Sequence, residues 1–200
     1  GYAFIYPLAA TMYFFGDSVL VARSFMVACI LVLIALSYLV IRSTYGRGMA
    51  LAALALLATF PPLYGNGKSV LGEVPALVFL VFSLLSLHRA TRTTSGSHVW
   101  IMLAGAAAGF AAAAKLLFLL FLPAFGVVVL YEWYRGRFST KDVSLAGTCS
   151  ALPVLVWLFV QYHEVRSMGD IFSFYINPYA VESLWSVVVG NLVHFETDAG

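Results

Sequence analysis

Long apolar stretches separated by short polar breaks fill most of the first 162 residues. A membrane-spanning helix needs about 20 apolar residues, because its backbone groups must bond to one another inside the hydrocarbon. Six stretches are expected to cross a membrane: 19–41, 49–63, 70–87, 99–114, 116–131 and 143–162. The sequence therefore predicts an all-α fold, a polytopic transmembrane helical bundle.

The apolar run 99–131 is interrupted by Lys115 and forms either one span or two, and the loop charges favour two. With six spans, one side collects seven cations against Glu132 and Asp142: Arg42, Arg47, Arg89, Arg92, Arg135, Arg137 and Lys141. The other side holds four cations, Arg23, Lys68, Lys115 and Arg166, against seven acids. Cytoplasmic loops are enriched in Lys and Arg, so the first side is predicted to be cytoplasmic and the second to face outward.

Three segments follow from this topology. Residues 1–18 are expected to form an outward juxtamembrane segment, because their aromatic side chains suit a helix that rests in the membrane interface. Residues 19–162 form the transmembrane bundle, and 163–200 an outward loop. Within the bundle, the alanines and glycines of 105–114 leave little side-chain bulk, which predicts close helix packing.

Composition agrees with a membrane protein and excludes several other classes. The chain is 62% hydrophobic and 10% charged, whereas soluble domains carry about 25% charged residues. A net charge of +2 without a basic run gives no support for nucleic-acid binding. Cys29 and Cys149 lie inside apolar runs and indicate no disulfide scaffold. Glycine-rich phosphate loops, paired-cysteine motifs and zinc-protease motifs are absent from the sequence.

The polar turn 61–75 holds the best candidates for chemistry. Glu73 could bind a divalent cation or act on an acceptor hydroxyl, and it is equally explained as a first-turn acid favoured by the helix dipole. Lys68 could meet a phosphate as a point charge, or contact a lipid headgroup or Glu73. Tyr64 could stack or donate a hydrogen bond to a substrate, although an interfacial tyrosine commonly serves only as an anchor.

Other charged residues at the outward side are weaker candidates. Lys115, between two apolar runs, either pairs with a lipid-borne phosphate or extends its ammonium to water. Arg23 could bind an anionic lipid head or pair with Asp17. His163 and Arg166 open the long outward segment, whose aromatic residues form either a platform for a sugar or an interfacial belt. Loops of that length commonly carry function.

Several of these features together resemble the GT-C superfamily of polytopic glycosyltransferases, in the branch of the protein O-mannosyltransferases and the lipid A aminoarabinose transferase. The resemblance rests on the order of motifs over about residues 1–131: Tyr6-Pro7-Leu8, Phe14-Phe15-Gly16-Asp17-Ser18 with Arg23, Gly72-Glu73-Val74-Pro75, and Gly105 to Lys115 followed by Pro123. Each motif alone is short, and their spacing carries the inference.

The resemblance implies transfer of a sugar from a polyprenyl-phosphate carrier to a lipid or protein acceptor on the outer side of the membrane, which would be a bacterial or archaeal inner membrane. It implies that Glu73 serves a metal, such as Mg²⁺ or Mn²⁺, or the acceptor, and that Lys68 or Lys115 lies near the carrier phosphate. The family's principal catalytic aspartate is expected before Gly1, and Asp17 does not replace it. The chain alone is therefore expected to lack full activity.

Two other functional classes remain open at this point. In a transporter or permease, Glu73, Lys115 and Arg23 would line a translocation path; however, such paths usually need polar groups near the bilayer midplane, and here the ionisable groups gather at span ends. In a non-catalytic assembly subunit, the Ala/Gly-rich fifth apolar segment would be a docking face.

Overall fold

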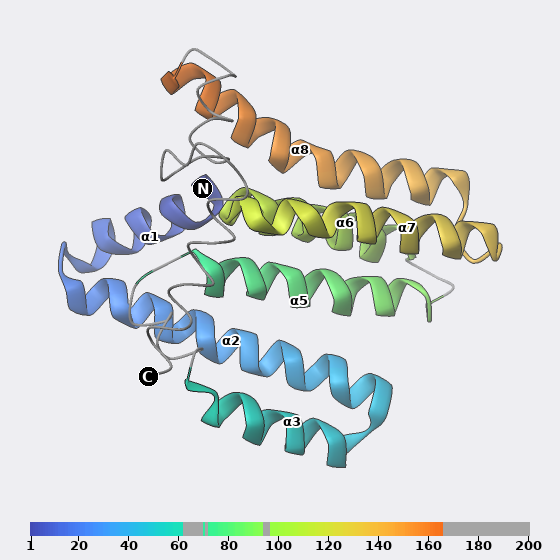
Figure 1. The fold of residues 1–200 in the computed structure, drawn as a ribbon, viewed down its shortest axis with the longest axis horizontal. Helices are drawn as coiled ribbons and strands as arrows, with labels where there is room; N and C mark the ends of the chain where they lie inside the picture. The colour runs from blue at the N-terminus through green and yellow to red at the C-terminus, as the bar shows by residue number, and fades with distance from the viewer. Residues whose placement is uncertain (62–69, 71, 94–96, 166–200) are drawn as a thin grey trace, which may run out of the picture. The chain divides into compact units, whose positions relative to one another are not determined.

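The computed structural model describes residues 1–61, 70, 72–93 and 97–165 of the chain, with side chains as far as residue 162. These residues are almost entirely helical and include no strand (Figure 1), so the predicted all-α class is confirmed. The chain divides into two compact units, Gly1–Trp157 and Leu158–Gly200. The packing described below is that of the first unit; of the second, the structure describes only the end of one helix.

Seven α-helices and one short 3₁₀-helix make up the described chain. Their bounds are α1 Tyr2–Phe15, α2 Val19–Tyr45, α3 Arg47–Thr59, α5 Glu73–Ala90, α6 Ser97–Ala114, η1 Leu116–Leu120, α7 Phe121–Tyr134 and α8 Thr140–Val165. Five segments in the described part are long and apolar enough to cross a membrane: Val19–Tyr45, Glu73–Ala90, Ser97–Ala114, Leu116–Tyr134 and Thr140–Tyr162. These five coincide with five of the six predicted spans.

The remaining predicted span, 49–63, corresponds to α3, which has 13 residues. At a rise of about 1.5 Å per residue this helix is about 20 Å long, shorter than the hydrocarbon core of about 30 Å. Within the run 99–131, α6 ends at Ala114 and Lys115 is extended, with φ −145° and ψ 121°, so the helix breaks at the residue where the sequence divides the run. The chain then resumes as η1 and α7.

Successive helices from α2 to α8 reverse direction within the first unit (Figure 1), so the connections alternate between two ends of the bundle. One end, here called the arginine end, carries the seven cations that the sequence groups together: Arg42, Arg47, Arg89, Arg92, Arg135, Arg137 and Lys141. The other, here called the acid–lysine end, holds the start of α5 and the end of α6, with Glu73 and Lys115. The seven cations that the sequence groups together therefore share one end of the described bundle.

The small residues of α6 allow the backbone of α8 to approach closely. A Cβ atom placed on Gly105 would lie 2.6 Å from the carbonyl oxygen of Ala146, and one on Gly109 would lie 2.3 Å from that of Ser150. Neither distance leaves room for a side chain, so both glycines are required by the packing. The prediction that this segment serves close helix contact is confirmed.

Helix α5 packs most extensively against α6, and α2 packs against both α3 and α5. A hydrogen bond from the buried hydroxyl of Ser83 to the carbonyl oxygen of Ala104, 2.8 Å long, joins the middles of α5 and α6. An interhelical hydrogen bond of this kind is favoured in hydrocarbon, where a lone hydroxyl has no water to bind. The two helices therefore form one hairpin.

Helix α1 is tied to α8 by a polar contact from its first residue. The Tyr2 hydroxyl donates a hydrogen bond of 3.0 Å to the carbonyl oxygen of Pro153. Pro153 lies inside α8, and burial raises the pKa of the Tyr2 phenol above its ordinary value. The expected juxtamembrane segment 1–18 is thus a helix that packs on the bundle.

Candidate functional site

Glu73 is the first residue of α5. It follows Gly72, and Pro75 occupies an early helical position where its missing N–H has no helical partner to lose. A carboxylate in the first turn is stabilised by the helix dipole. The side chain is 26% exposed. Glu73 is therefore a first-turn acid, as one interpretation of the sequence predicts. That interpretation does not identify the partner of its carboxylate.

That partner is Lys115, whose ammonium nitrogen Nζ lies 2.5 Å from Glu73 Oε1. The lysine backbone is fixed on both sides: its N–H donates to Ala111 O, and its carbonyl accepts from Phe118 N. The side chain is 41% exposed. Lys115 therefore binds a protein anion at the acid–lysine end and is not simply extended into water, as one interpretation of the sequence expected.

The pair follows from the dimensions of the α5–α6 hairpin. Both helices contain 18 residues, so each extends about 27 Å from their common turn. The first residue of α5 and the residue after α6 consequently reach the same level. Gly72 makes this level close-packed, because a Cβ atom there would lie 3.0 Å from the carbonyl oxygen of Ala114.

The second carboxylate oxygen of Glu73 is not used by the described residues. Oε2 is buried and has no hydrogen-bond partner among them. Buried polar atoms in proteins rarely lack a hydrogen-bond partner. Those that do commonly have a catalytic role or contact a bound group. Glu73 thus has one oxygen that is held by Lys115 and a second, buried oxygen that has no hydrogen-bond partner among the described residues.

For the metal ion that the resemblance implies at Glu73, the residues that the structure describes supply a single carboxylate. No group of three or more His, Cys, Asp or Glu side chains gathers anywhere in the described ranges. Mg²⁺ is usually bound by one or two carboxylates together with substrate phosphates, and here the single carboxylate already faces an ammonium group. The metal stays a prediction, and no step below depends on it.

Of the other predicted site residues, the structure describes the side chain of Arg23 alone. Arg23 is exposed near the start of α2 and forms no ion pair with Asp17 in the described chain. Lys68, Tyr64 and Arg166 lie outside the described residues, as do the side chain of His163 and the aromatic residues that follow it. Their predicted contact with substrate stays a prediction.

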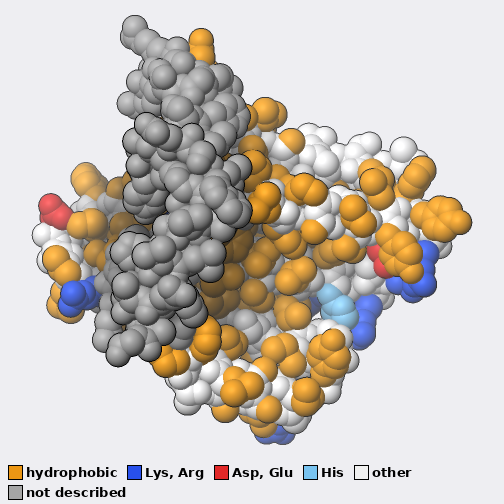
Figure 2. Space-filling model, in the orientation of Figure 1, with side chains coloured by type: hydrophobic (Ala, Val, Ile, Leu, Met, Phe, Trp, Pro, Cys, Tyr) orange, Lys and Arg blue, Asp and Glu red, His pale blue; other side chains and the backbone are white. Residues whose placement is uncertain are grey.

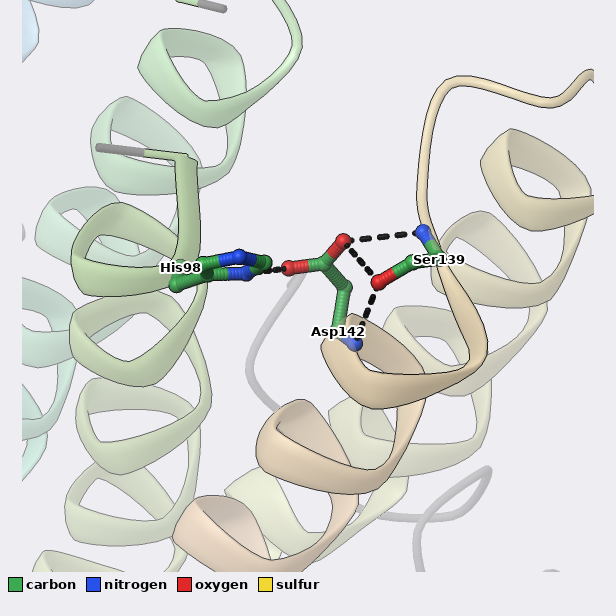
Figure 3. A network of polar contacts seen from close by, with 3 residues as sticks. All are labelled: His98, Ser139 and Asp142. Carbon is green, nitrogen blue, oxygen red and sulfur yellow. Dashed lines mark hydrogen bonds and ion pairs between the residues drawn. The ribbon is translucent and has the colours of Figure 1, made fainter. Parts of the chain in front are cut away.

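The arginine end contains a polar network that the sequence analysis does not identify (Figure 3). His98 Nδ1 lies 2.5 Å from Asp142 Oδ1, joining the first turn of α6 to that of α8. The other oxygen, Oδ2, accepts hydrogen bonds from the backbone N–H and the hydroxyl of Ser139. The Ser139 oxygen in turn accepts from the backbone N–H of Asp142, at 3.2 Å.

Ser139 and Asp142 form a capping box at the start of α8. The spacing Ser-x-x-Asp before an apolar helix is the sequence signal for this arrangement, with aspartate in the place of the usual glutamate. The signal was available in the sequence and predicts the helix start, although not the contact with His98. Asp142 is 4% exposed, and both its oxygens are used.

Three further cations at the arginine end, Arg89, Arg135 and Arg137, also contact neighbouring side chains. Arg137 Nη1 donates to the buried Glu132 Oε2 at 2.9 Å. The Arg89 guanidinium carbon lies 4.9 Å from the centre of the Trp100 ring, and that of Arg135 lies 4.7 Å from the centre of the Tyr131 ring. Such cation–π contacts are worth about 0.5–1 kcal/mol at exposed sites. The Arg89–Trp100 contact joins α5 to α6, whereas the other two lie at the end of α7 and the residues just after it.

Comparison with known proteins supplies the family. No curated protein and no solved structure matches the chain. A family model described as dolichyl-phosphate-mannose-protein mannosyltransferase matches residues 2–159, a stretch that contains both Glu73 and Lys115. The match covers most of the chain and agrees with the five long apolar helices. The chain is therefore a multi-pass integral membrane protein that belongs to the dolichyl-phosphate-mannose-protein mannosyltransferase family of membrane glycosyltransferases.

Proposed function

We propose that the protein transfers a sugar from a polyprenyl-phosphate carrier to an acceptor hydroxyl at the acid–lysine end of the bundle. The observation that carries this proposal is the Glu73–Lys115 pair, in which one carboxylate oxygen remains without a partner among the described residues. A carboxylate and an ammonium group side by side are suited to an acceptor hydroxyl and a carrier phosphate, respectively. The family name supports a dolichyl-phosphate type of donor.

In the proposed reaction, the bond between the sugar C1 atom and the phosphate oxygen breaks, and its electron pair passes to the phosphate. The acceptor oxygen forms the new bond to C1 and loses its proton. Glu73 Oε2 accepts that proton as a general base. The Lys115 ammonium has three N–H donors and gives one to Glu73, so two remain to stabilise the charge that develops on the departing phosphate.

We place the acid–lysine end on the outer side of the membrane, and the charge difference between the two ends supports this proposal. Seven cations gather at the arginine end, and cytoplasmic loops are the ones enriched in Lys and Arg. A bacterial or archaeal plasma membrane is proposed on the family resemblance. A carrier whose prenyl chain stays in the bilayer would present its phosphate at the level of Lys115.

The test is sugar transfer from a radiolabelled polyprenyl-phosphate donor, measured in membranes that contain the intact protein. Glu73→Gln keeps the shape of the side chain and removes the base, so transfer is expected to fall by about 100-fold or more. Asp17→Asn, at an exposed acid in the turn between α1 and α2, is the matched control and is expected to retain activity. Unchanged transfer by Glu73→Gln would remove Glu73 from the mechanism.

The sidedness has its own test. After Cys29 and Cys149 are replaced by serine, Asp17→Cys and Lys141→Cys introduce single thiols at exposed positions near opposite ends of the bundle. A membrane-impermeant maleimide added to intact cells is expected to label position 17 and not position 141. The opposite labelling pattern would place the proposed site in the cytoplasm and contradict a donor presented at the outer leaflet.

A further inference from the structure

The first turn of α1 lies at the acid–lysine end, beside the end of α6 (Figure 1). Its backbone at Gly1 lies against Ala114, the residue before Lys115. Phe4 reaches the start of α5, where a Cβ atom placed on Gly72 would lie 3.5 Å from Cδ1 of the Phe4 ring. This turn therefore contacts the chain immediately before each member of the ion pair.

The Phe4 ring packs between α2 and α5. Its centre lies 6.5 Å from that of the Phe25 ring, at an interplanar angle of 41°. The side chain also packs against the buried cluster of α2 and α5 that contains Met26 and Val74. Val74 follows Glu73 in the chain, so Phe4 approaches the residue before Glu73 and packs against the cluster that includes the residue after it. These contacts fix the place where α5 begins.

The position of Phe4 is fixed by other contacts of α1. The Tyr2 hydroxyl donates a hydrogen bond of 3.0 Å to the carbonyl oxygen of Pro153 in α8, and Ala3 is buried. The first turn of α1 is thus held by α8 as well as by α2, α5 and α6. Catalytic groups keep a productive geometry when the side chains that support them are themselves locked by packing.

The Glu73–Lys115 pair depends on such support, because its two members belong to different segments of the chain. On the face shown in Figure 2, hydrophobic side chains predominate and the charged ones lie toward its edges. Charged groups at the border of an apolar surface rely on each other for compensation. A displacement of about 1 Å at a reacting group can lower a rate by about 100-fold. A small movement of the start of α5 is therefore expected to affect the reaction.

We infer that Phe4 is a positioning residue for the proposed reaction: it holds the start of α5 against the end of α6 and thereby aligns Glu73 with Lys115. Phe4 contacts no reacting atom and acts through Glu73. This inference rests on the proposed function and extends the site to α1, which supplies neither the base nor the cation.

The test is a cycle of single and double substitutions, measured as sugar transfer in membranes that contain the intact protein. Phe4→Ala removes the ring, and kcat per folded molecule is expected to fall about tenfold while KM stays nearly unchanged. In the Glu73→Gln background, Phe4→Ala is expected to have no further effect, because it acts through Glu73. Phe4→Leu keeps most of the apolar volume and is expected to recover most of the lost rate.

Phe15→Ala is the matched control, since Phe15 belongs to the same helix and is 76% exposed. Its kcat is expected to equal that of the unmodified protein. The amount of folded protein is measured by fluorescence-detected size-exclusion chromatography. Should Phe4→Ala fail to fold, Phe4→Val keeps part of the packing and is expected to lower kcat about threefold.

The inference is overturned if the Phe4 variants reduce the amount of folded protein but not kcat. It is also overturned if the effect of Phe4→Ala multiplies with that of Glu73→Gln, because Phe4 would then act independently of the carboxylate. Unchanged transfer by Glu73→Gln would overturn the proposed function, and this inference with it. The Glu73→Gln variant thus distinguishes failure of the positioning role from failure of the proposed function.

Discussion

The two ends of the α5–α6 hairpin hold their charged side chains in different ways. At the arginine end, Asp142 has both oxygens engaged by His98 and Ser139, and Glu132 is buried against Arg137. At the acid–lysine end, Glu73 has one oxygen on Lys115 and one without a partner in the described chain. The same residue types thus fasten helices at one end and leave bonding capacity at the other.

This difference separates structural acids from a reactive one. A buried acid whose oxygens are all used contributes to stability and has nothing left to offer a substrate. A partly buried acid with an available oxygen beside a cation is the arrangement from which acid–base chemistry is built. The comparison therefore predicts that substitutions at the acid–lysine end affect activity, whereas those at the arginine end affect stability.

The largest effect is expected from exchanging the two members of the pair. Glu73→Lys combined with Lys115→Glu restores opposite charges at the same level, so the midpoint of thermal unfolding in detergent is expected to recover relative to either single substitution. Sugar transfer is expected to remain about 100-fold or more below that of the unmodified protein, because base and cation have changed places. If the exchange restores sugar transfer, the Glu73–Lys115 pair has only a structural role. The acids at both ends of the bundle would then serve stability alone.

Asp142→Ala, at the arginine end, is expected to lower the stability of the protein and to leave its activity unchanged. It removes the contact to His98 and the cap of α8, which lowers the free energy of unfolding by about 2–3 kcal/mol. Unfolding in denaturant, followed by circular dichroism, measures this loss. The transfer rate per folded molecule is expected to stay unchanged, and a large drop in that rate would show that the arginine end also takes part in the chemistry.

A smaller effect is expected from Gly109→Ala, on the face of α6 that packs on α8. The added Cβ would lie 2.3 Å from the carbonyl oxygen of Ser150, so α8 has to move, at a cost of about 1–2 kcal/mol. Gly126→Ala in α7, where nothing lies within 4 Å of an added Cβ, is the control and is expected to be neutral or slightly stabilising. Equal stability of the two variants would contradict the close packing.

Much of the fold could be predicted from the sequence, since hydrophobic length and loop charge are local properties. The break at Lys115 is an example: charge counting divided the run 99–131 where the structure ends α6. The pairing of Lys115 with Glu73 could not be predicted from apolar length and loop charge. It depends on the positions of α5 and α6 relative to each other along their axes, which the turn between them sets. Both residues were candidates, but their contact is a property of the hairpin.

The His98–Asp142 contact was missed for the same reason. The Ser139–Asp142 spacing indicates where α8 begins, whereas the approach of α6 depends on the glycines that bring these helices together. In the sequence, Asp142 enters only the count of loop charges, and no local pattern links it to His98. Local capping signals can thus be recognised in advance, and contacts between helices far apart in the sequence need the packed structure.

The neighbouring helices α2 and α3 contain 27 and 13 residues, respectively, so their lengths are about 40 Å and 20 Å. A hydrocarbon layer about 30 Å thick matches neither of them. We expect the longer helix to tilt and the bilayer to become thinner around the shorter one. The thickness of the surrounding bilayer, set by acyl-chain length, therefore acts directly on this part of the protein.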